Sequence, residues 1–139
     1  VEGNAVETDN KITRTLKLSS DHSDQVMAAI ETAARGGYPL CVFLLQISDA
    51  FMELNLQLLD AFRLALRQSD QVIETDLGEF MILCPYTPLK GLHAVENKIK
   101  DAVVSATQDT VHDVYLCGVN FPEQVTSYHE LITKLTCCV

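Results

Sequence analysis

Arg67 and Asp70 lie three residues apart at the end of a predicted helix, and their side chains could bind an anion. An arginine presents a planar fork of donors that matches a phosphate, and a neighbouring carboxylate accepts hydrogen bonds from amines. Arg63 lies one helical turn earlier and can add a second positive charge on the same face. The pattern has two interpretations. It is either a small-anion site or a solvated helix end, where Arg67 is favourable to the helix dipole and Asp70 is a cap.

The other reactive side chains form no catalytic or metal-binding pattern in the sequence. The histidines are not paired at helical spacing, and none lies near a Ser or Cys with an acidic partner. The cysteines include no C-x-x-C pair, so no zinc site is predicted. Cys41, Cys84 and Cys117 lie in apolar runs and are expected to be small, buried, free thiols. We therefore predict no catalytic residue and no bound metal.

The charge balance argues against two classes of partner. The chain of 139 residues has 19 acidic and 10 basic residues, and its net charge is −9. Nucleic acids and anionic membranes are bound by clustered Lys and Arg, so neither is expected as a partner. No apolar run approaches the roughly 20 residues of a spanning helix, so no direct membrane insertion is expected. Because the sequence does not begin with Met, we expect a domain of a longer protein, whose membrane-associated parts would lie outside this chain. The free cysteines expected from the sequence fit a reducing cytoplasm.

Hydrophobic periodicity divides the chain into an arm and one domain. Residues 1–19 are predicted to be a linker or extended N-terminal arm, and residues 20–139 to be the domain. From residue 38 onward the predicted order is strand, helix, strand, strand, helix, strand, helix, and one further helix precedes it. The strands are predicted at 39–47, 71–75, 79–86 and 112–121. This is the βαββαβ order of a ferredoxin-like α+β sheet with flanking helices.

Capping residues predict where the helices begin. Ser48 or Asp49 is expected to cap the helix after the first strand, with one apolar stripe facing the core. The stripe consists of Phe51, Leu54, Leu58, Phe62 and Leu66. Thr87 and Pro88 are expected to open the next helix, because proline is favoured in the first helical turn. Ser127 is expected to begin the last helix.

The segment from residue 67 to residue 80 resembles the centre of a GGDEF domain, the fold of diguanylate cyclases. In that family an R-x-x-D signature precedes a strand, and the GGDEF turn occupies the following hairpin. Here Arg67-Gln68-Ser69-Asp70 matches the signature, and the turn reads Asp76-Leu77-Gly78-Glu79-Phe80. The last two letters of the turn match and the first three do not. The resemblance spans about residues 38–135 and implies a fold like that of nucleotide cyclases.

The resemblance also implies that the cyclase active site is degenerate. The family's metal-binding D-x-D corresponds to residues 46–48, where Gln46 offers Mg²⁺ a carbonyl oxygen but no charge. The paired glycines of the turn are replaced by Asp76-Leu77, and the acidic ligand that follows them by Gly78. Glu79 remains, but one carboxylate cannot organise a two-metal phosphoryl transfer. No cyclase activity is expected.

The family's guanine-recognition loop is shortened here, and Asn55, the local candidate for a guanine contact, is predicted in mid-helix. The R-x-x-D signature corresponds to the family's product-binding inhibitory site. The leading hypothesis is therefore a non-catalytic GGDEF-like module of a larger bacterial signalling protein. It would bind cyclic di-GMP through Arg67, Asp70 and Arg63, need no other cofactor, and pass the signal to other domains, to other subunits or to a second copy. The alternative is a nucleotide-independent interaction or dimerisation domain.

Overall fold

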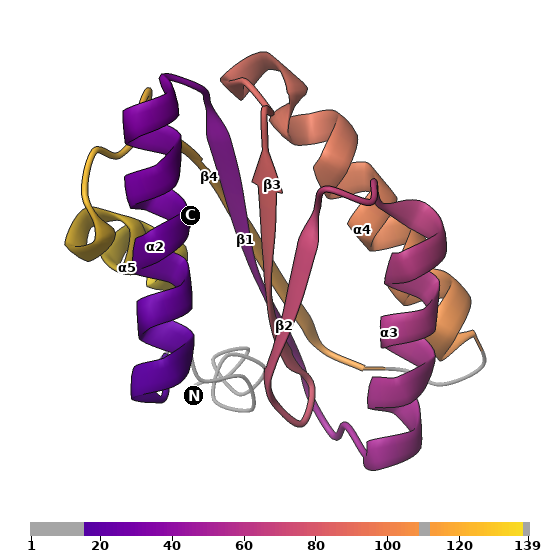
Figure 1. Cartoon of the computed structure of the whole chain (residues 1–139). Coiled ribbons are helices and arrows are strands. Elements are labelled where there is room, and N and C mark those ends of the chain that lie inside the picture. Colours follow the sequence, from indigo (N-terminus) through magenta and orange to yellow (C-terminus); the bar gives the residue numbers. More distant parts are fainter. Residues whose placement is uncertain (1–15, 109–111, 138–139) are drawn as a thin grey trace.

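In the part of the chain that the computed structural model describes, residues 16–108 and 112–137, a four-stranded antiparallel sheet lies between two layers of helices (Figure 1). The strands are β1 (Leu40–Ile47), β2 (Gln71–Asp76), β3 (Glu79–Pro85) and β4 (Val114–Phe121), in the order β2-β3-β1-β4. The helices are α2 (Ser20–Gly36), α3 (Met52–Ala65), α4 (Leu92–Thr107) and α5 (Tyr128–Thr136), with a 3-10 turn η1 (Leu89–Gly91) before α4. The predicted α+β, ferredoxin-like order is confirmed.

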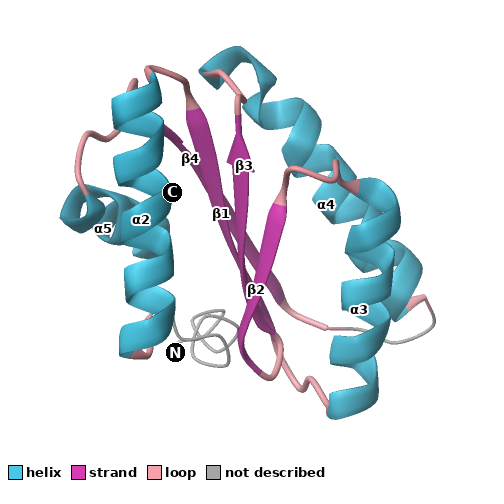
Figure 2. Ribbon diagram, viewed as in Figure 1, coloured by secondary structure: helices cyan, strands magenta, loops and turns pink. Residues whose placement is uncertain are grey.

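The central strand β1 has side chains buried on both faces of the sheet. All eight of its residues are buried, as expected for a nearly continuous apolar run. Phe43 and Leu45 pack with α3 and α4, whereas Val42 and Leu44 pack with α2 and α5. Figure 2 shows the two pairs of helices on opposite sides of the sheet. The sheet therefore separates two hydrophobic cores.

The cysteines of the strands are all buried, but they do not all have the same chemistry. Cys41 and Cys84 are free thiols that face each other across β1 and β3. Cys117 is disulfide-bonded, so the expectation of a free thiol at this position is wrong. The strand position itself is as predicted, because Cys117 is 1% exposed in β4.

The predicted start of α3 is wrong. Phe51, rather than Ser48 or Asp49, is the N-cap residue, and its side chain makes no capping hydrogen bond. Asp49 has φ 55° in the turn after β1. Ser48 Oγ accepts a hydrogen bond from the backbone N–H of Asp113 (2.9 Å), so it ties the end of β1 to the segment before β4. Phe51 is 50% exposed and does not belong to the core stripe.

The start of α4 also differs from the prediction, whereas that of α5 is confirmed. Thr87 and Pro88 lead into η1, and α4 begins later, at Leu92. The Thr87 side chain makes no capping bond at this point, because it is engaged by an arginine described below. Ser127 caps α5 by accepting from the backbone N–H of Glu130 (3.2 Å).

The predicted arm at residues 1–19 falls mostly outside the described residues. Of its described part, Leu16 and Leu18 are half-buried against the core on the α2 side of the sheet. That end of the predicted arm thus contacts the domain. Among the described helices, none combines the length and apolar character that a bilayer-crossing helix requires.

Candidate functional site

Arg67 and Asp70 form a closed ion pair in the loop between α3 and β2. The backbone N–H of Arg67 donates to Asp70 Oδ2 (2.9 Å), and Arg67 Nη2 donates to Asp70 Oδ1 (3.1 Å). The Asp70 side chain is 2% exposed, whereas that of Arg67 is 45% exposed. Both carboxylate oxygens already accept hydrogen bonds from Arg67. Asp70 therefore orients the guanidinium and leaves part of it open to solvent.

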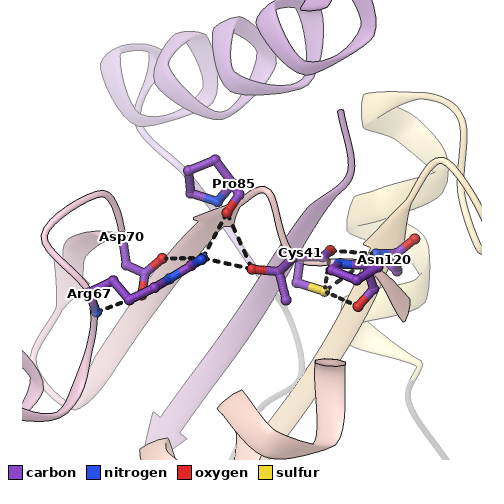
Figure 3. A network of polar contacts seen from close by, with 7 residues as sticks. Cys41, Arg67, Asp70, Pro85 and Asn120 are labelled. Atoms are coloured by element: carbon purple, nitrogen blue, oxygen red, sulfur yellow. Dashed lines mark hydrogen bonds and ion pairs between the residues drawn. The ribbon is translucent and has the colours of Figure 1, made fainter. Parts of the chain in front are cut away.

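Arg67 also bonds to the connection that follows β3 (Figure 3). Its Nη2 donates to the Pro85 carbonyl (2.7 Å) and to Thr87 Oγ1 (2.8 Å). Nη2 carries two hydrogens, so Asp70, Pro85 and Thr87 must share them. Within the described residues, neither Nε nor Nη1 of Arg67 makes a hydrogen bond. Nη2 of the guanidinium therefore holds the loop, whereas Nε and Nη1 have N–H groups that a ligand could use.

A buried polar network continues from Thr87 into the sheet (Figure 3). Asn120 Nδ2 donates to the Thr87 carbonyl (3.0 Å), and the Cys41 thiol donates to the same oxygen (3.4 Å). Burial raises the pKa of the Cys84 thiol far above its ordinary range, and the charge of Asp70 adds to the rise. Burial likewise raises the pKa of Cys41, although the Asn120 hydrogen bond opposes it. Because a thiol must ionise to attack, both cysteines act as packing groups here.

A hollow of about 560 Å³ lies beside the end of α3 and the start of β2. Its lining combines apolar and charged side chains, namely Leu59, Phe62, Arg63, Leu66, Arg67, Gln68, Asp70 and Val72. Arg63 Nη1 pairs with Asp60 Oδ1 (3.1 Å), and their side chains are 75% and 74% exposed. An exposed pair of this kind is weak, so Arg63 can turn toward a ligand at small cost. The structure therefore gathers Arg63, Arg67 and Asp70 around one hollow.

The turn between β2 and β3 is packed against the end of β1. Asn55 of α3 is 1% exposed, and its Nδ2 donates to Glu74 Oε2 and to the Asp76 carbonyl (3.2 Å). Its Oδ1 accepts from the backbone N–H of Gly78 (2.8 Å). The Gly78 carbonyl in turn accepts from the Ile47 N–H (2.7 Å). Both Nδ2 and Oδ1 of Asn55 therefore bond to the turn and its strands, and neither is left to contact a guanine base.

Gln46 and Glu79 hydrogen-bond each other near the same turn. Gln46 Nε2 donates to Glu79 Oε2 (2.8 Å), and Thr75 Oγ1 donates to Glu79 Oε1 (2.8 Å). Gln46 is 6% exposed, and its Oε1 has no hydrogen-bond partner among the described residues. Across residues 16–108 and 112–137, no group of three or more His, Cys, Asp or Glu side chains is placed to hold a metal ion. A neutral amide thus lies beside the Glu79 carboxylate.

The predicted site residues form two groups at opposite ends of the β2–β3 hairpin. Asp70 precedes β2 and Pro85 ends β3, whereas Asp76 and Glu79 flank the turn at the other end. The sequence interpretation missed two partners of the Arg67 network. Asn120 carried a signal, because a polar residue inside an apolar strand needs hydrogen-bond partners when it is buried. Pro85 contributes only its backbone carbonyl. Every residue has such a carbonyl, so the sequence gives no signal for this contact.

Solved GGDEF domains share this architecture. A DGC protein from Thermotoga maritima superposes with a TM-score of 0.71 at 15% identity, over 91% of this chain and 98% of that chain. The chain has a GGDEF-like fold. The isolated GGDEF domain of YfiN from Pseudomonas aeruginosa gives a TM-score of 0.61 at 19% identity, over 88% of this chain and 81% of that one. The GGDEF domain of DgcB from Caulobacter crescentus, solved in complex with c-di-GMP, gives 0.62 at 14% identity, over 84% and 78%.

The GGDEF-like fold is established by comparison of structures and not by overall sequence similarity. No family model matches the chain, and no curated protein matches it. Superposition at such low identity establishes the fold, and one fold supports many functions. The activity of this GGDEF-like chain must therefore be argued from its own side chains.

Proposed function

We propose that this chain is a non-catalytic GGDEF-like regulatory domain that binds cyclic di-GMP in the hollow beside Arg67. The observation that carries the proposal is a guanidinium that is fixed by Asp70, is 45% exposed and lines a hollow of about 560 Å³. A cyclic dinucleotide presents phosphates, which suit arginine donors, and flat bases, which suit apolar walls. Arg67 and Arg63 supply the donors, and Phe62 and Val72 supply apolar surface.

Asp70 acts in this proposal as a positioning residue. Its carboxylate is almost fully buried and accepts twice from Arg67, so it is engaged before any ligand arrives. The sequence interpretation gave Asp70 a direct contact with a guanine amine. Such a contact requires the ion pair to open, whereas orientation of Arg67 requires no change.

The absence of catalysis is the second part of the proposal, and the other end of the hairpin supports it. Two-metal phosphoryl transfer needs several carboxylates to hold the cations. Gln46 is neutral and donates to Glu79, the acidic residue of the turn that matches the family's motif. Gly78 lies against Ile47 so closely that even a Cβ atom would meet the Ile47 carbonyl at 2.4 Å. The neutral Gln46 and the close packing of the turn against β1 therefore both argue against a bound metal triphosphate.

Isothermal titration calorimetry with cyclic di-GMP tests the binding proposal. We expect a Kd in the micromolar range or below, which corresponds to roughly −8 kcal/mol. Arg67→Ala should weaken binding about tenfold to a hundredfold, because it removes charge-assisted hydrogen bonds. Arg63→Ala should weaken it less, since Arg63 begins in an exposed pair with Asp60.

Arg35→Ala is the matched control for these titrations. Like Arg63, Arg35 lies in the last turn of a helix and pairs with an acidic side chain, Glu31, but it is on α2, on the opposite side of the sheet. Loss of one positive charge there should leave the affinity unchanged. Equal weakening in Arg35→Ala and Arg67→Ala would show a non-specific charge effect. If cyclic di-GMP produces neither heat on titration into the parent chain nor a shift in its Tm, the receptor role is refuted.

A nucleotide-independent interaction domain is the second candidate, and one observation favours it. Three apolar side chains of α3 are strongly exposed: Met52 at 72%, Leu56 at 58% and Leu64 at 90%. Large exposed apolar residues on one helix are typical of contact surfaces. Analytical ultracentrifugation of the parent chain and of Leu64→Ser distinguishes the candidates. Self-association that Leu64→Ser abolishes, together with no response to cyclic di-GMP, would favour the interaction domain.

A further inference from the structure

Tyr86, between β3 and η1, adopts a backbone conformation that bulky residues avoid. Its φ is 58°, in the left-handed region, and its side chain is 62% exposed. For an L-residue with a Cβ, the left-handed conformation is strained by contact with the following carbonyl. Such an outlier persists only where neighbouring contacts hold it in place. The contacts that hold Tyr86 are therefore informative.

Arg67 holds both residues that flank Tyr86. Its Nη2 donates to the Pro85 carbonyl (2.7 Å) and to Thr87 Oγ1 (2.8 Å), and Thr87 Oγ1 itself donates to the Pro85 carbonyl (3.3 Å), so Arg67 reinforces a link that closes the turn across Tyr86. The Thr87 carbonyl is fixed from the opposite direction by Asn120 Nδ2 (3.0 Å) and by the Cys41 thiol (3.4 Å). Thr87 is thus a buried anchor, whereas Tyr86 is exposed.

The ring of Tyr86 links the turn to the opposite layer of the domain. It stacks on Tyr38, with ring centroids 4.1 Å apart and an interplanar angle of 28°. Tyr38 follows the left-handed Gly37 that ends α2, and it packs with the core on the α2 side. A change of backbone conformation at Tyr86 would separate the two rings. The turn therefore joins the Arg67 loop to the end of α2.

A phosphate that binds Arg67 competes with this turn for the same nitrogen. A guanidinium grips a phosphate with two parallel N–H groups, either from Nη1 and Nη2 or from Nε and Nη2. Both edges include Nη2, and the two hydrogens of Nη2 already serve three acceptors. A bidentate contact with a phosphate takes one of these two hydrogens, so it must displace at least one acceptor from Nη2.

We propose that Arg67 is a latch on the strained Tyr86 turn, and that a phosphate-bearing ligand opens it. The ligand draws Nη2 away from Pro85 and Thr87, Tyr86 relaxes out of the left-handed region, and its ring leaves Tyr38. This inference rests on the proposed cyclic dinucleotide site and adds how occupancy of that site reaches the α2 side of the sheet. Relief of strain at Tyr86 favours the open, ligand-bound state.

NMR of the isotope-labelled parent chain tests the latch without a ligand. The Cα and Cβ chemical shifts of Tyr86 report its φ. In Arg67→Ala they should move from left-handed values to those of negative φ, while Thr87, held by its carbonyl, should shift little. Arg63→Ala is the control and should leave Tyr86 unchanged. Left-handed Tyr86 shifts that persist in Arg67→Ala would overturn the latch.

A matched pair of variants tests the coupling to the ligand. Tyr86→Gly and Tyr86→Ala both remove the ring and its contact with Tyr38, and they differ only in the Cβ that strains the closed turn. Glycine adopts the left-handed conformation of the closed turn without strain, whereas alanine does not, so opening the turn relieves strain only in Tyr86→Ala. Tyr86→Gly should therefore bind cyclic di-GMP about tenfold more weakly than Tyr86→Ala. Equal affinities in the two variants would refute the latch and leave the receptor role standing. No binding by the parent chain would refute both.

Discussion

Gly78→Ala is the substitution whose effect the structure defines most sharply. Gly78 has φ 71° in the turn between β2 and β3, where a residue with a Cβ is strained. An added Cβ would also lie 2.4 Å from the Ile47 carbonyl oxygen and 2.6 Å from Ala50 Cβ. Neither neighbour is the end of a flexible side chain, so the turn itself must move. That movement disturbs the bonds that Gly78 makes with Asn55 and Ile47.

The expected loss of stability has two parts. The left-handed conformation costs an alanine about 1–2 kcal/mol relative to glycine. Steric overlap with well-packed neighbours adds about 1–3 kcal/mol. Gly78→Ala should therefore lower the free energy of unfolding by about 2–5 kcal/mol in total.

Gly37→Ala separates these two parts, because Gly37 shares the conformation but not the crowding. Its φ is 68°, and an added Cβ would meet nothing within 4 Å. Urea unfolding of both variants should show the strain alone at Gly37, about 1–2 kcal/mol, and a clearly larger loss at Gly78. The smaller entropy of the unfolded chain with alanine is common to both variants and cancels. Equal losses would mean that the turn is not packed against β1, which would remove the steric argument against a bound triphosphate.

Three further predictions concern catalysis, the core of the sheet and helix α5. Incubated with GTP and Mg²⁺ or Mn²⁺, the chain should form no cyclic di-GMP, and turnover that Glu79→Ala abolishes would contradict the loss of the metal site. Leu45→Ala should lower the free energy of unfolding by about 2–5 kcal/mol, because Leu45 is fully buried in β1; a loss under 1 kcal/mol in urea unfolding would contradict the assigned core. Hydrogen bonds from the Thr126 backbone and side chain hold the pKa of Glu130 below its usual value. The stabilisation of α5 by Glu130 should thus be present above the ordinary carboxyl pKa and be lost as pH falls through the lowered value. Circular dichroism of Glu130→Gln checks this, since a difference from the parent chain that persists at acid pH would exclude the carboxylate as its cause.

The order of strands and helices was predictable because it follows from periodicity along the chain. Leu40–Ile47 is a nearly unbroken apolar run of β-forming residues, and such a run is stable only with both faces covered. Leu54, Leu58 and Phe62 recur at helical spacing and are buried on one face of α3. These signals depend only on the identities of neighbouring residues, so they predict the elements without any knowledge of distant contacts.

The start of α3 was mispredicted because a distant partner replaced a local one. Ser48 has the right chemistry to cap a helix, but its hydroxyl accepts from Asp113, 65 residues later in the chain. Asp49 adopts the left-handed conformation in the turn instead. Capping rules concern the few residues around a helix end, whereas pairing of β1 with β4 decided the partner of Ser48.

The sequence by itself determined the local pair of Arg67 and Asp70. Arg67 and Asp70 are three apart at a helix exit, and this spacing is enough to pair a carboxylate with the backbone and side chain of the same arginine. Only the tertiary structure decided that Asp70 is buried and that Arg67 Nη2 also holds Pro85 and Thr87. Those two acceptors lie about 20 residues further along the chain, and they meet the arginine only after β3 has paired with β2. Residue spacing sets the local pair, whereas strand pairing sets which further acceptors the same Nη2 can reach.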